Sequence, residues 1–324
     1  MQALRVHAFD QPPRLDTLPD PAPAPGEVRV RVQACGISFF DLLIARGAYQ
    51  WQPGLPFTVG SEFARRVDAL GEGAAGFALG DRVCGSSSIG AWTDALCVVP
   101  DALQPVAPQA SLDEAAVLHT PYGTALYALR ERGGLQSGET VLVLGATGSI
   151  GDAGVQLARS MGARVIAGVS GTAKQAAARA AGADAVVDLQ ADDWKDQVKA
   201  LVGPRGVDVV LDPIGGAFMD TAFRTLGWGG RHLVAGFASG AIGSLRGNLA
   251  IVKGASLIGV DLRQFREREP QALQRVLQDV TALHQAGRVR PRIAARFPFE
   301  QAAQAFALAQ RRETVGRVVL HPLR

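Results

Sequence analysis

The chain has 324 residues, of which 48% are hydrophobic, and its 33 basic and 30 acidic side chains leave a formal charge of +3. This length predicts two domains, with one large α/β domain as the alternative. So small a net charge gives no basis for a nucleic-acid-binding or membrane-binding surface, and no apolar run reaches transmembrane length.

The cysteines and the first residues indicate the compartment. Cys35, Cys84 and Cys97 are odd in number and lack the Cys-x-x-Cys spacing, so they favour free thiols over a disulfide framework. The first ten residues carry charges and no apolar core, and no signal peptide is expected. Both observations predict a cytoplasmic protein.

The first 122 residues are rich in Gly and Pro and predict short β-strands. Residues 27–34 alternate apolar and polar side chains, as a half-buried strand does. Residues 65–85 predict two strands joined by Gly-rich turns, and 91–100 predict another strand that Pro100 ends. The proline-rich segment 19–27 is interpreted as an extended loop, with a polyproline ligand as the alternative.

The pattern changes at Ser111, which can cap a helix together with Glu114 three residues later. From Val141 onward, apolar strands alternate with helices. Such alternation predicts a parallel sheet covered on both faces, and six strands match the doubly wound dinucleotide fold. The predicted strands are 140–146, 164–169, 184–189, 207–212, 231–237 and 256–261; predicted helices include 152–162, 172–182 and 194–202. Residues 297–320 predict one helix and one last strand, which we expect to rejoin the first domain.

The turn after the first strand of this array reads Ala146-Thr147-Gly148-Ser149-Ile150-Gly151, an A-x-G-x-x-G pattern. Gly148 would let the backbone approach a pyrophosphate, and Gly151 would let the helix pack closely on the strand. The helix N-terminus adds free N–H groups and the positive end of its dipole. Strand, turn and helix in this order predict a bound dinucleotide; the alternative is a turn that only packs.

The end of the second strand indicates which dinucleotide binds. NAD sites usually carry an acidic residue there for the ribose 2′-hydroxyl, but this chain has Ser170, with Lys174 on the next helix. A hydroxyl and an ammonium suit a 2′-phosphate, so the sequence favours NADPH. The alternative for Lys174 is a solvated lysine on a helix surface.

Several separated motifs make the whole chain resemble the medium-chain dehydrogenase/reductase superfamily. They are "PGEVRVRVQACGIS", "VGSEF", "GDRV", "AAVLHTPYGTALYAL", the glycine-rich turn and the closing "GRVVL". The resemblance implies an α/β protein with a GroES-like β-rich catalytic domain and a Rossmann domain with a doubly wound, six-stranded parallel sheet. The expected boundaries are 1–123 for the first part of the catalytic domain, 124–260 for the NADP(H)-binding domain and 261–324 for the return to the catalytic domain.

Zinc members of this superfamily carry metal ligands at three positions where this chain has Ser38, Ser61 and Thr120. Hydroxyls cannot supply a catalytic zinc site, which needs nitrogen, sulfur or carboxylate ligands; an alignment shifted to His119 is the alternative at the third position. The four-cysteine lobe is also missing, so Cys84 and Cys97 are interpreted as core thiols. The pattern, with "GSEF", "PYGTALYAL", "DPIGG", "LVAGFASG" and "NLAIVKGASLIGV", resembles the zinc-independent NADPH:quinone oxidoreductase branch, and no metal is expected.

The resemblance also implies roles for individual residues. Tyr49 would line the nicotinamide pocket and orient the acceptor, Thr124 would contact the nicotinamide amide, and Ser170 and Lys174 would face the adenosine phosphate. Some relatives have Asn at the position of Ser38 and an aromatic or histidine at that of Leu189. Asp41 matches a family aspartate, with a structural or a catalytic role. The further cofactor-binding candidates are Ser38, Thr147, Gly148, Ser149 and Ile150 (the last four for the pyrophosphate), and Ile214, Gly236, Phe237 and Ala238 (for the nicotinamide ribose).

The implied reaction is hydride transfer from NADPH to a quinone or another conjugated carbonyl compound, with a proton from water. The expected cleft between the domains is lined by Phe39, Leu43, Tyr49 and Phe237, whereas Phe40 is assigned to the core. Alternatives are an enoyl or alkenal reductase, for which the basic run 261–269 could meet a phosphate-rich substrate, and a non-catalytic NADPH-binding sensor or structural protein. The superfamily also implies a homodimer that pairs through the edge strand 256–261.

Overall fold

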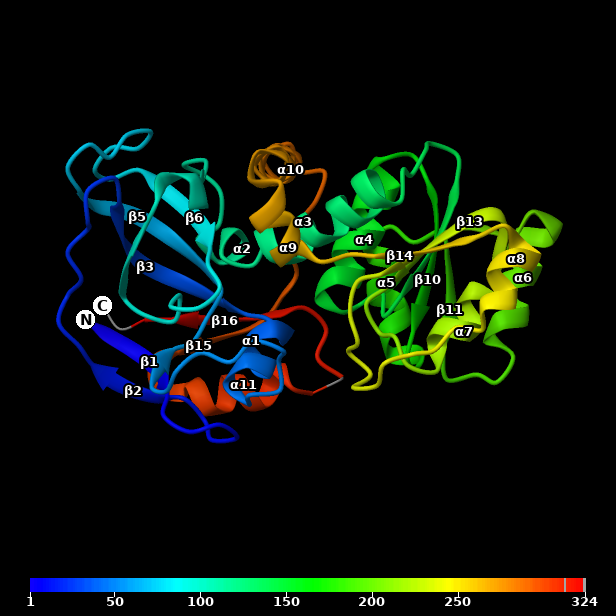
Figure 1. Cartoon of the computed structure of the whole chain (residues 1–324), viewed down its shortest axis with the longest axis horizontal. Coiled ribbons are helices and arrows are strands. Elements are labelled where there is room, and N and C mark those ends of the chain that lie inside the picture. Colours follow the sequence, from blue (N-terminus) through cyan, green and yellow to red (C-terminus); the bar gives the residue numbers. More distant parts are fainter. Residues whose placement is uncertain (312, 323–324) are drawn as a thin grey trace. The chain divides into compact units, whose positions relative to one another are not determined.

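The chain forms two compact units in a computed structural model that describes residues 1–311 and 313–322. Unit 1 consists of Met1–Thr120 and the residues from Arg290 on, and unit 2 of Pro121–Val289. In Figure 1 the blue, cyan and red segments belong to unit 1, and the green to orange segments belong to unit 2. In the described part of the chain, no helix combines the length and apolar character needed to cross a membrane.

Unit 1 is built on β-sheets. A seven-stranded sheet has the order β15-β16-β3-β5-β6-β8, with β7 also paired to β3, and a three-stranded sheet has the order β2-β1-β4. Its strands are β1 (Gln2–Val6), β2 (Arg14–Thr17), β3 (Val28–Ile37), β4 (Phe57–Thr58), β5 (Glu62–Leu70), β6 (Arg82–Ser86), β7 (Ala95–Val98), β8 (Leu103–Pro105), β15 (Ile293–Pro298) and β16 (Arg317–His321). Its helices are α1 (Phe39–Ala45), α2 (Leu112–Ala115), α11 (Ala302–Ala309) and the start of α3 (His119–Leu126).

The alternation predicted for residues 27–34 determines how β3 lies in its sheet. Val28, Val30 and Val32 are buried, whereas Arg29 and Arg31 face outward and both bind the Asp68 carboxylate. At the other end of the chain, β16 pairs antiparallel with β3, and β15 pairs parallel with β16. The last strand therefore completes a sheet that the first hundred residues began.

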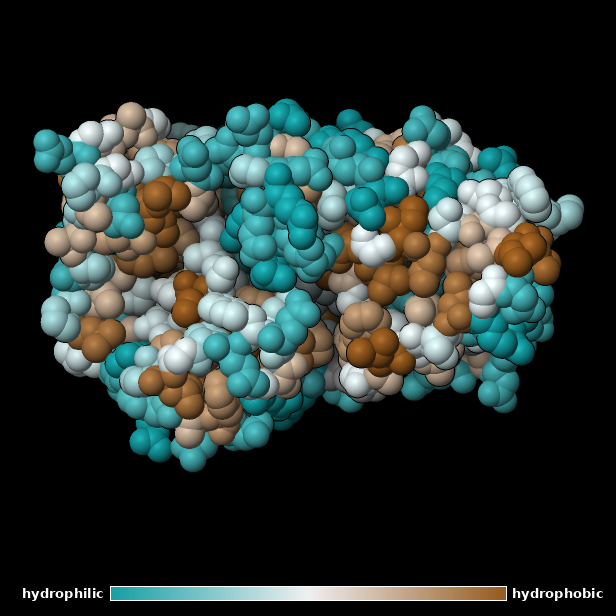
Figure 2. Space-filling view, viewed as in Figure 1, coloured by the Kyte–Doolittle hydropathy of each residue, from teal (hydrophilic) through white to brown (hydrophobic). Residues whose placement is uncertain are grey.

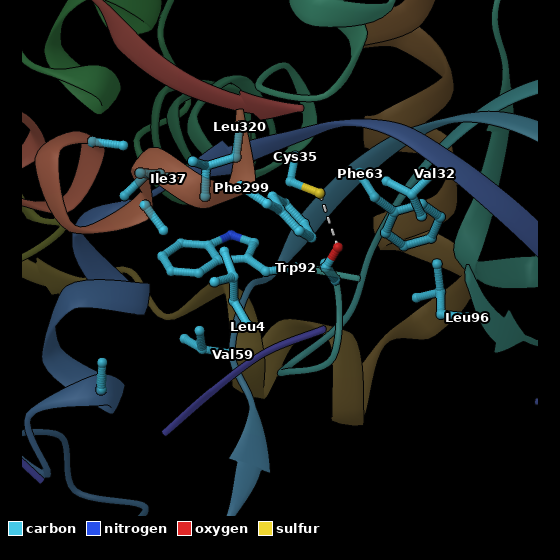
Figure 3. Packing of buried hydrophobic residues seen from close by; sticks show 14 of the residues in the cluster. Leu4, Val32, Cys35, Ile37, Val59, Phe63, Trp92, Leu96, Phe299 and Leu320 are labelled. Carbon is cyan, nitrogen blue, oxygen red and sulfur yellow. Dashed lines mark hydrogen bonds between the residues drawn. The ribbon is translucent and has the colours of Figure 1, made fainter. Parts of the chain in front are cut away.

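The core of unit 1 surrounds Trp92, which is 1% exposed and donates its indole N–H to the Gly36 carbonyl at 3.0 Å. Figure 3 shows the neighbouring Cys35 thiol directed at the Ala91 carbonyl, at 3.0 Å. Burial raises the pKa of the Cys35 thiol well above its usual range. All three cysteines are free, as their number and spacing predict. Other side chains labelled in this core are Leu4, Val32, Ile37, Val59, Phe63, Leu96, Phe299 and Leu320.

Unit 2 contains the predicted six-stranded sheet, in the order β11-β10-β9-β12-β13-β14, with every pair parallel. Its strands are β9 (Thr140–Leu144), β10 (Arg164–Val169), β11 (Ala185–Asp188), β12 (Val207–Asp212), β13 (Leu226–Val234) and β14 (Ser256–Gly259). Its helices are α4 (Ser149–Ser160), α5 (Gln175–Ala180), α6 (Trp194–Val202), α7 (Phe218–Phe223), α8 (Gly247–Lys253), α9 (Leu262–Arg268) and α10 (Pro270–Gln285), besides most of α3 and a π-helical turn at Tyr127–Arg132. The predicted fold class, a GroES-like β-rich part with a doubly wound parallel sheet, is confirmed.

The units divide the chain after residues 120 and 289, whereas the sequence placed the divisions after 123 and 260. The difference at the second division comes from α9 and α10, which belong to unit 2. The Phe265 ring stacks on Tyr127 with ring centroids 3.9 Å apart, and Arg130 Nη1 lies 2.7 Å from Asp279 Oδ2. Such contacts join segments that are far apart in the sequence, so no local pattern marks them.

Gly151 of unit 2 is packed against backbone so closely that replacing it should destabilise the fold. A Cβ there would lie 2.1 Å from the backbone oxygen of Gly145, which cannot move independently of the turn. We expect Gly151→Ala to lower the free energy of unfolding by about 2–3 kcal/mol, as overpacking typically does. Urea unfolding of the variant and the wild type, without added cofactor, measures this difference in the free energy of unfolding.

Gly247→Ala is the matched control, because Gly247 opens helix α8 and a Cβ there would meet nothing within 4 Å. This variant should be neutral or slightly stabilising, since Ala has the higher helix propensity. Equal stability of Gly151→Ala and the wild type would contradict the proposed clash.

Candidate functional site

The glycine-rich turn between β9 and α4 has the geometry of an anion-binding turn. Gly148 is the N-cap of α4, and no side chain caps the helix there. The first amides of a helix have no intrahelical acceptor, so they and the positive end of the helix dipole suit a negatively charged group. Gly148 and Ser149 are exposed, Ile150 is half-buried and Thr147 is buried. These are the residues that the sequence assigned to the pyrophosphate.

Two glycines share the packing role that the motif assigns to Gly151 alone. The contact of Gly151 with the Gly145 carbonyl shows that it allows the chain to cross over its own turn. The close approach of α4 to the sheet belongs to Gly154, where a Cβ would lie 2.4 Å from Leu211 Cδ2 of β12. Gly154 stands one helical turn after Gly151, and its small size in an apolar helix is the signal that could have identified it.

A polar network connects α4 to α3, and sequence reasoning missed it. Gln156 Nε2 donates to Tyr122 Oη at 2.9 Å and to Asp152 Oδ2 at 2.7 Å. Tyr122 is 2% exposed and lies two residues before Thr124, which is itself buried. The network holds the start of α4 against the helix that carries Thr124.

Ser170 and Lys174 lie together after β10. Lys174 Nζ is 3.1 Å from Ser170 Oγ, and Ser170 is exposed. An acid from the neighbouring strand does bond to this turn: Asp188 ends β11, and its Oδ1 accepts the Gly171 and Gln190 N–H groups at 3.0 Å each. These two hydrogen bonds lower the pKa of the Asp188 carboxyl. Leu189 packs beside Gly168, where a Cβ would lie 2.9 Å from Leu189 Cδ2.

The remaining candidates of unit 2 follow the carboxyl ends of two neighbouring strands. Ile214 comes two residues after β12, and Gly236 begins a short run after β13 with Phe237 and Ala238. Gly236 and Ile214 are half-buried, whereas Phe237 is 39% exposed. Ligands of open α/β sheets bind outside these strand ends, so the structure brings these candidates to the edge where a dinucleotide is expected.

In unit 1, Ser38 and Ser61, two of the positions that the sequence aligned with metal ligands, belong to a buried polar cluster. Ser38 Oγ donates to Asp41 Oδ2 at 2.7 Å and lies 3.4 Å from Ser61 Oγ. Ser38 and Asp41 also form the capping box of α1. Burial raises the pKa of the Asp41 carboxyl to about 6, although the hydrogen bonds from Ser38 act to lower it. Asp41 is thus a structural cap that is buried together with the two serines it lies beside.

The third position, Thr120, is part of a second buried arrangement. The Thr120 N–H donates to Glu62 Oε1 at 2.9 Å, and Arg317 Nη2 donates to Glu62 Oε2 at 2.7 Å. His119 instead lies beside Cys84, with 3.8 Å between Nε2 and Sγ, and burial raises the pKa of that thiol. Within the described ranges, no three His, Cys, Asp or Glu side chains converge as metal ligands. Two serine hydroxyls and a threonine do not fit a catalytic zinc ion.

The aromatic candidates of unit 1 lie on and after α1. Phe39 is 47% exposed at the first position of the helix, and Leu43 is half-buried one turn later. The Phe40 ring meets Tyr49 edge to face, with centroids 4.9 Å apart, and both pack on the core of unit 1. The sequence assigned Phe40 to the core, which this packing confirms.

Comparison with known proteins agrees with this architecture. The alcohol dehydrogenase GroES-like domain matches residues 24–103, and a domain described as zinc-binding dehydrogenase matches 149–278. Quinone oxidoreductase-like protein 2 of Bos taurus is 37% identical over 297 residues, which cover 91% of this chain and 85% of that protein. Quinone oxidoreductase of Rattus norvegicus is 32% identical over 309 residues, with 94% and 92% covered.

Among solved structures, a mycobacterial protein in complex with NADPH is similar over 99% of this chain and 100% of its own, with a TM-score of 0.91 and 29% identity. Each of these matches extends over both units of this chain. The chain therefore belongs to the medium-chain dehydrogenase/reductase superfamily, within its quinone oxidoreductase branch, and is an oxidoreductase that uses a nicotinamide cofactor.

Proposed function

We propose that the protein is an NADPH-dependent reductase that transfers a hydride to a quinone or another conjugated carbonyl compound without zinc. The observation that carries this proposal is the Ser38–Asp41–Ser61 cluster, in which hydroxyls and a carboxyl occupy positions where zinc relatives hold the metal. The names and cofactor of the relatives support the reaction class.

The residues of unit 2 fit NADPH. Thr147, Gly148, Ser149 and Ile150 would hold the pyrophosphate at the uncapped N-terminus of α4. Ser170 Oγ and Lys174 Nζ, which lie 3.1 Å apart, would bind the 2′-phosphate. Thr124 and the residues after β12 and β13 would hold the nicotinamide half. When bound, NADPH supplies the hydride from its reduced nicotinamide ring.

The acceptor chemistry follows from the donor atoms in unit 1. Oxidation of a simple alcohol requires removal of the hydroxyl proton, and zinc enzymes use the metal to make that alkoxide. Ser38 and Ser61 cannot do this. A quinone or enone needs no metal, because conjugation spreads the negative charge that arrives with the hydride, and water supplies the proton. Within this proposal, Tyr49 orients the acceptor, and Phe39 and Leu43 provide its apolar surroundings.

We also propose that a second copy of this chain covers the edge strand β14. β14 ends the six-stranded sheet, and an uncovered strand edge invites pairing. Exposed apolar side chains accompany it, which Figure 2 shows as brown surface over the region of β14 and α8. Large exposed apolar patches mark interfaces. The patch consists of Leu257 (46% exposed), Val252 (70%), Ile251 (80%) and Trp228 (84%). The free thiols support a cytoplasmic location.

The acceptor range tests the reaction. With NADPH, the purified protein should reduce small quinones or enones and leave saturated ketones almost unchanged; with NADP⁺ it should barely oxidise simple alcohols. Treatment with a chelator should leave the rate unchanged. Initial rates from NADPH absorbance measure each case.

Efficient oxidation of a simple alcohol, or activity that a chelator removes and zinc restores, would contradict the proposal. A preference for enoyl thioesters or alkenals over quinones would favour the enoyl reductase alternative. Tight NADPH binding without turnover of any acceptor would favour a non-catalytic binding protein.

Lys174 tests the choice of cofactor. Lys174→Ala should weaken NADPH binding about 10- to 100-fold, the equivalent of one charge-assisted hydrogen bond, and leave NADH binding nearly unchanged. Titration calorimetry with both cofactors measures this. Lys199→Ala, at a half-exposed lysine of α6 that lies near Asp196, is the control and should change neither value. Equal losses for NADPH and NADH in Lys174→Ala would show that this lysine does not read the 2′-phosphate.

Leu257 tests the dimer. Leu257→Asp would bury a charge in the proposed contact, so it should raise the dimer dissociation constant at least about tenfold, as an unpaired buried charge does. Leu79→Asp makes the same change at a leucine that is 63% exposed in unit 1, and should leave the dimer intact. Sedimentation velocity over a concentration series decides. A monomeric wild type, or an unchanged dimer in Leu257→Asp, would refute this interface.

A further inference from the structure

A buried Asp–His pair lies beneath the strand ends of unit 2, and neither residue belongs to the predicted site. We propose that Asp212 and His232 are positioning residues for the part of the cofactor site that binds the nicotinamide half, acting through the turn that carries Ile214. This inference rests on the proposed NADPH-dependent function.

The Asp212 carboxylate is the last side chain of β12, and both of its oxygens accept hydrogen bonds. Oδ1 accepts the backbone N–H groups of Ile214 at 2.9 Å and Gly215 at 2.8 Å. Oδ2 accepts from His232 Nε2 at 3.0 Å. Asp212 and His232 are both 0% exposed. One carboxylate thus connects the turn after β12 to the neighbouring strand β13.

The turn that Asp212 holds contains two consecutive glycines, which have many accessible backbone conformations. Gly215 and Gly216 have positive φ angles of 66° and 62°, in the left-handed region. A Cβ on Gly145 would lie 3.1 Å from the Ile214 side chain, so Ile214 packs against the residue that precedes the glycine-rich turn. The turn after β12 therefore lies beside the end of β9.

The same turn is joined to the loop after β13. The Ala235 N–H donates to the Asp212 carbonyl at 2.8 Å, Ala238 N–H to Pro213 at 3.1 Å and Ser239 N–H to Ile214 at 3.0 Å. The two loops that carry Ile214 and Phe237 consequently form one hydrogen-bonded body. Asp212 and His232 lie at its base, where the two strands end.

His232 has no other visible role. It lies in register with Val210 of β12, and its ring stacks near Phe223 with centroids 6.0 Å apart. Its Nδ1 is buried and has no hydrogen-bond partner among the described residues. A histidine in an apolar strand is costly to bury unless it is hydrogen-bonded. The hydrogen bond to Asp212 meets this need of His232. It also gives the buried Asp212 carboxylate a third donor, besides the N–H groups of Ile214 and Gly215.

Neither side chain is exposed, so neither can contact substrate or cofactor; both act through the Ile214 turn. Loss of the Asp212–His232 pair is therefore expected to weaken the binding of the nicotinamide half and not that of the adenosine half. NADPH spans both halves, whereas the fragment 2′,5′-ADP contains only the adenosine half. Loss of the pair should weaken NADPH binding and spare the fragment.

The test measures dissociation constants of NADPH and 2′,5′-ADP by titration calorimetry for the wild type, His232→Leu, His232→Gln and Asp212→Asn. His232→Leu and Asp212→Asn should weaken NADPH binding about tenfold, which corresponds to roughly 1.4 kcal/mol. The dissociation constants of these two variants for 2′,5′-ADP should stay within about twofold of the wild-type value, well under the tenfold change expected for NADPH. His232→Gln should recover most NADPH affinity, because its amide can donate to Asp212.

Asp208→Asn is the matched control on the same strand. Asp208 Oδ2 accepts the Thr140 N–H at 2.7 Å near the opposite end of β12. This variant should leave the ratio of the two constants unchanged. Thermal unfolding of each variant checks that it is folded. Asp212→Asn keeps the shape of the side chain and removes the buried charge, so it carries the test if His232→Leu does not fold.

Equal weakening of both ligands, the same ratio change in Asp208→Asn, or unchanged NADPH affinity in folded Asp212→Asn would overturn the positioning role. A wild type that binds neither NADPH nor the fragment would overturn the proposed function itself. The two failures are distinguishable, because only the second is seen in the unmodified protein.

Discussion

The crossing of Gly151 over the Gly145 carbonyl is the constraint on which the nucleotide unit depends. A Cβ at Gly151 would lie 2.1 Å from that oxygen, so only glycine allows β9 to lead into α4 through so short a turn. The turn leaves the first amides of α4 uncapped, and Gly154 then lets the helix lie close to β12. Ile214 packs against Gly145 from the side. The direction of α4 and the exposure of its first amides follow from this one contact.

Unit 1 has a corresponding constraint in the buried ion pair of Glu62 and Arg317, whose atoms lie 2.7 Å apart. Arg317 begins β16 and also donates to the Ile37 carbonyl at the end of β3, while Glu62 begins β5. The pair thus connects three strands of one sheet. Removal of one partner from a buried pair typically costs about 3–5 kcal/mol. Such a pair specifies where the returning C-terminal strand lies, although it gains little over an apolar contact.

The polar cluster of unit 1 bears on the proposed reaction through its donor atoms. Ser38 is the N-cap of α1, Ser61 directly precedes β5, and Thr120 lies in the first turn of α3. Ser38 Oγ donates to Asp41 Oδ2 and lies 3.4 Å from Ser61 Oγ. Within the proposed function, these hydroxyls suit acceptors that stabilise the incoming negative charge by their own conjugation, because they do not form a catalytic zinc site.

The sequence by itself determined the fold class, the six parallel strands and the glycine-rich turn, because these depend on local patterns of period and composition. It also identified the hydroxyls at the ligand positions, since residue type alone decides whether a side chain can bind zinc. Only the tertiary structure decided that α9 and α10 belong with unit 2, that Gly154 as well as Gly151 lets α4 lie close to the sheet, and that Asp212 meets His232. These features arise from contacts between residues distant in the sequence. No local pattern records such contacts, because each partner alone is compatible with many surroundings.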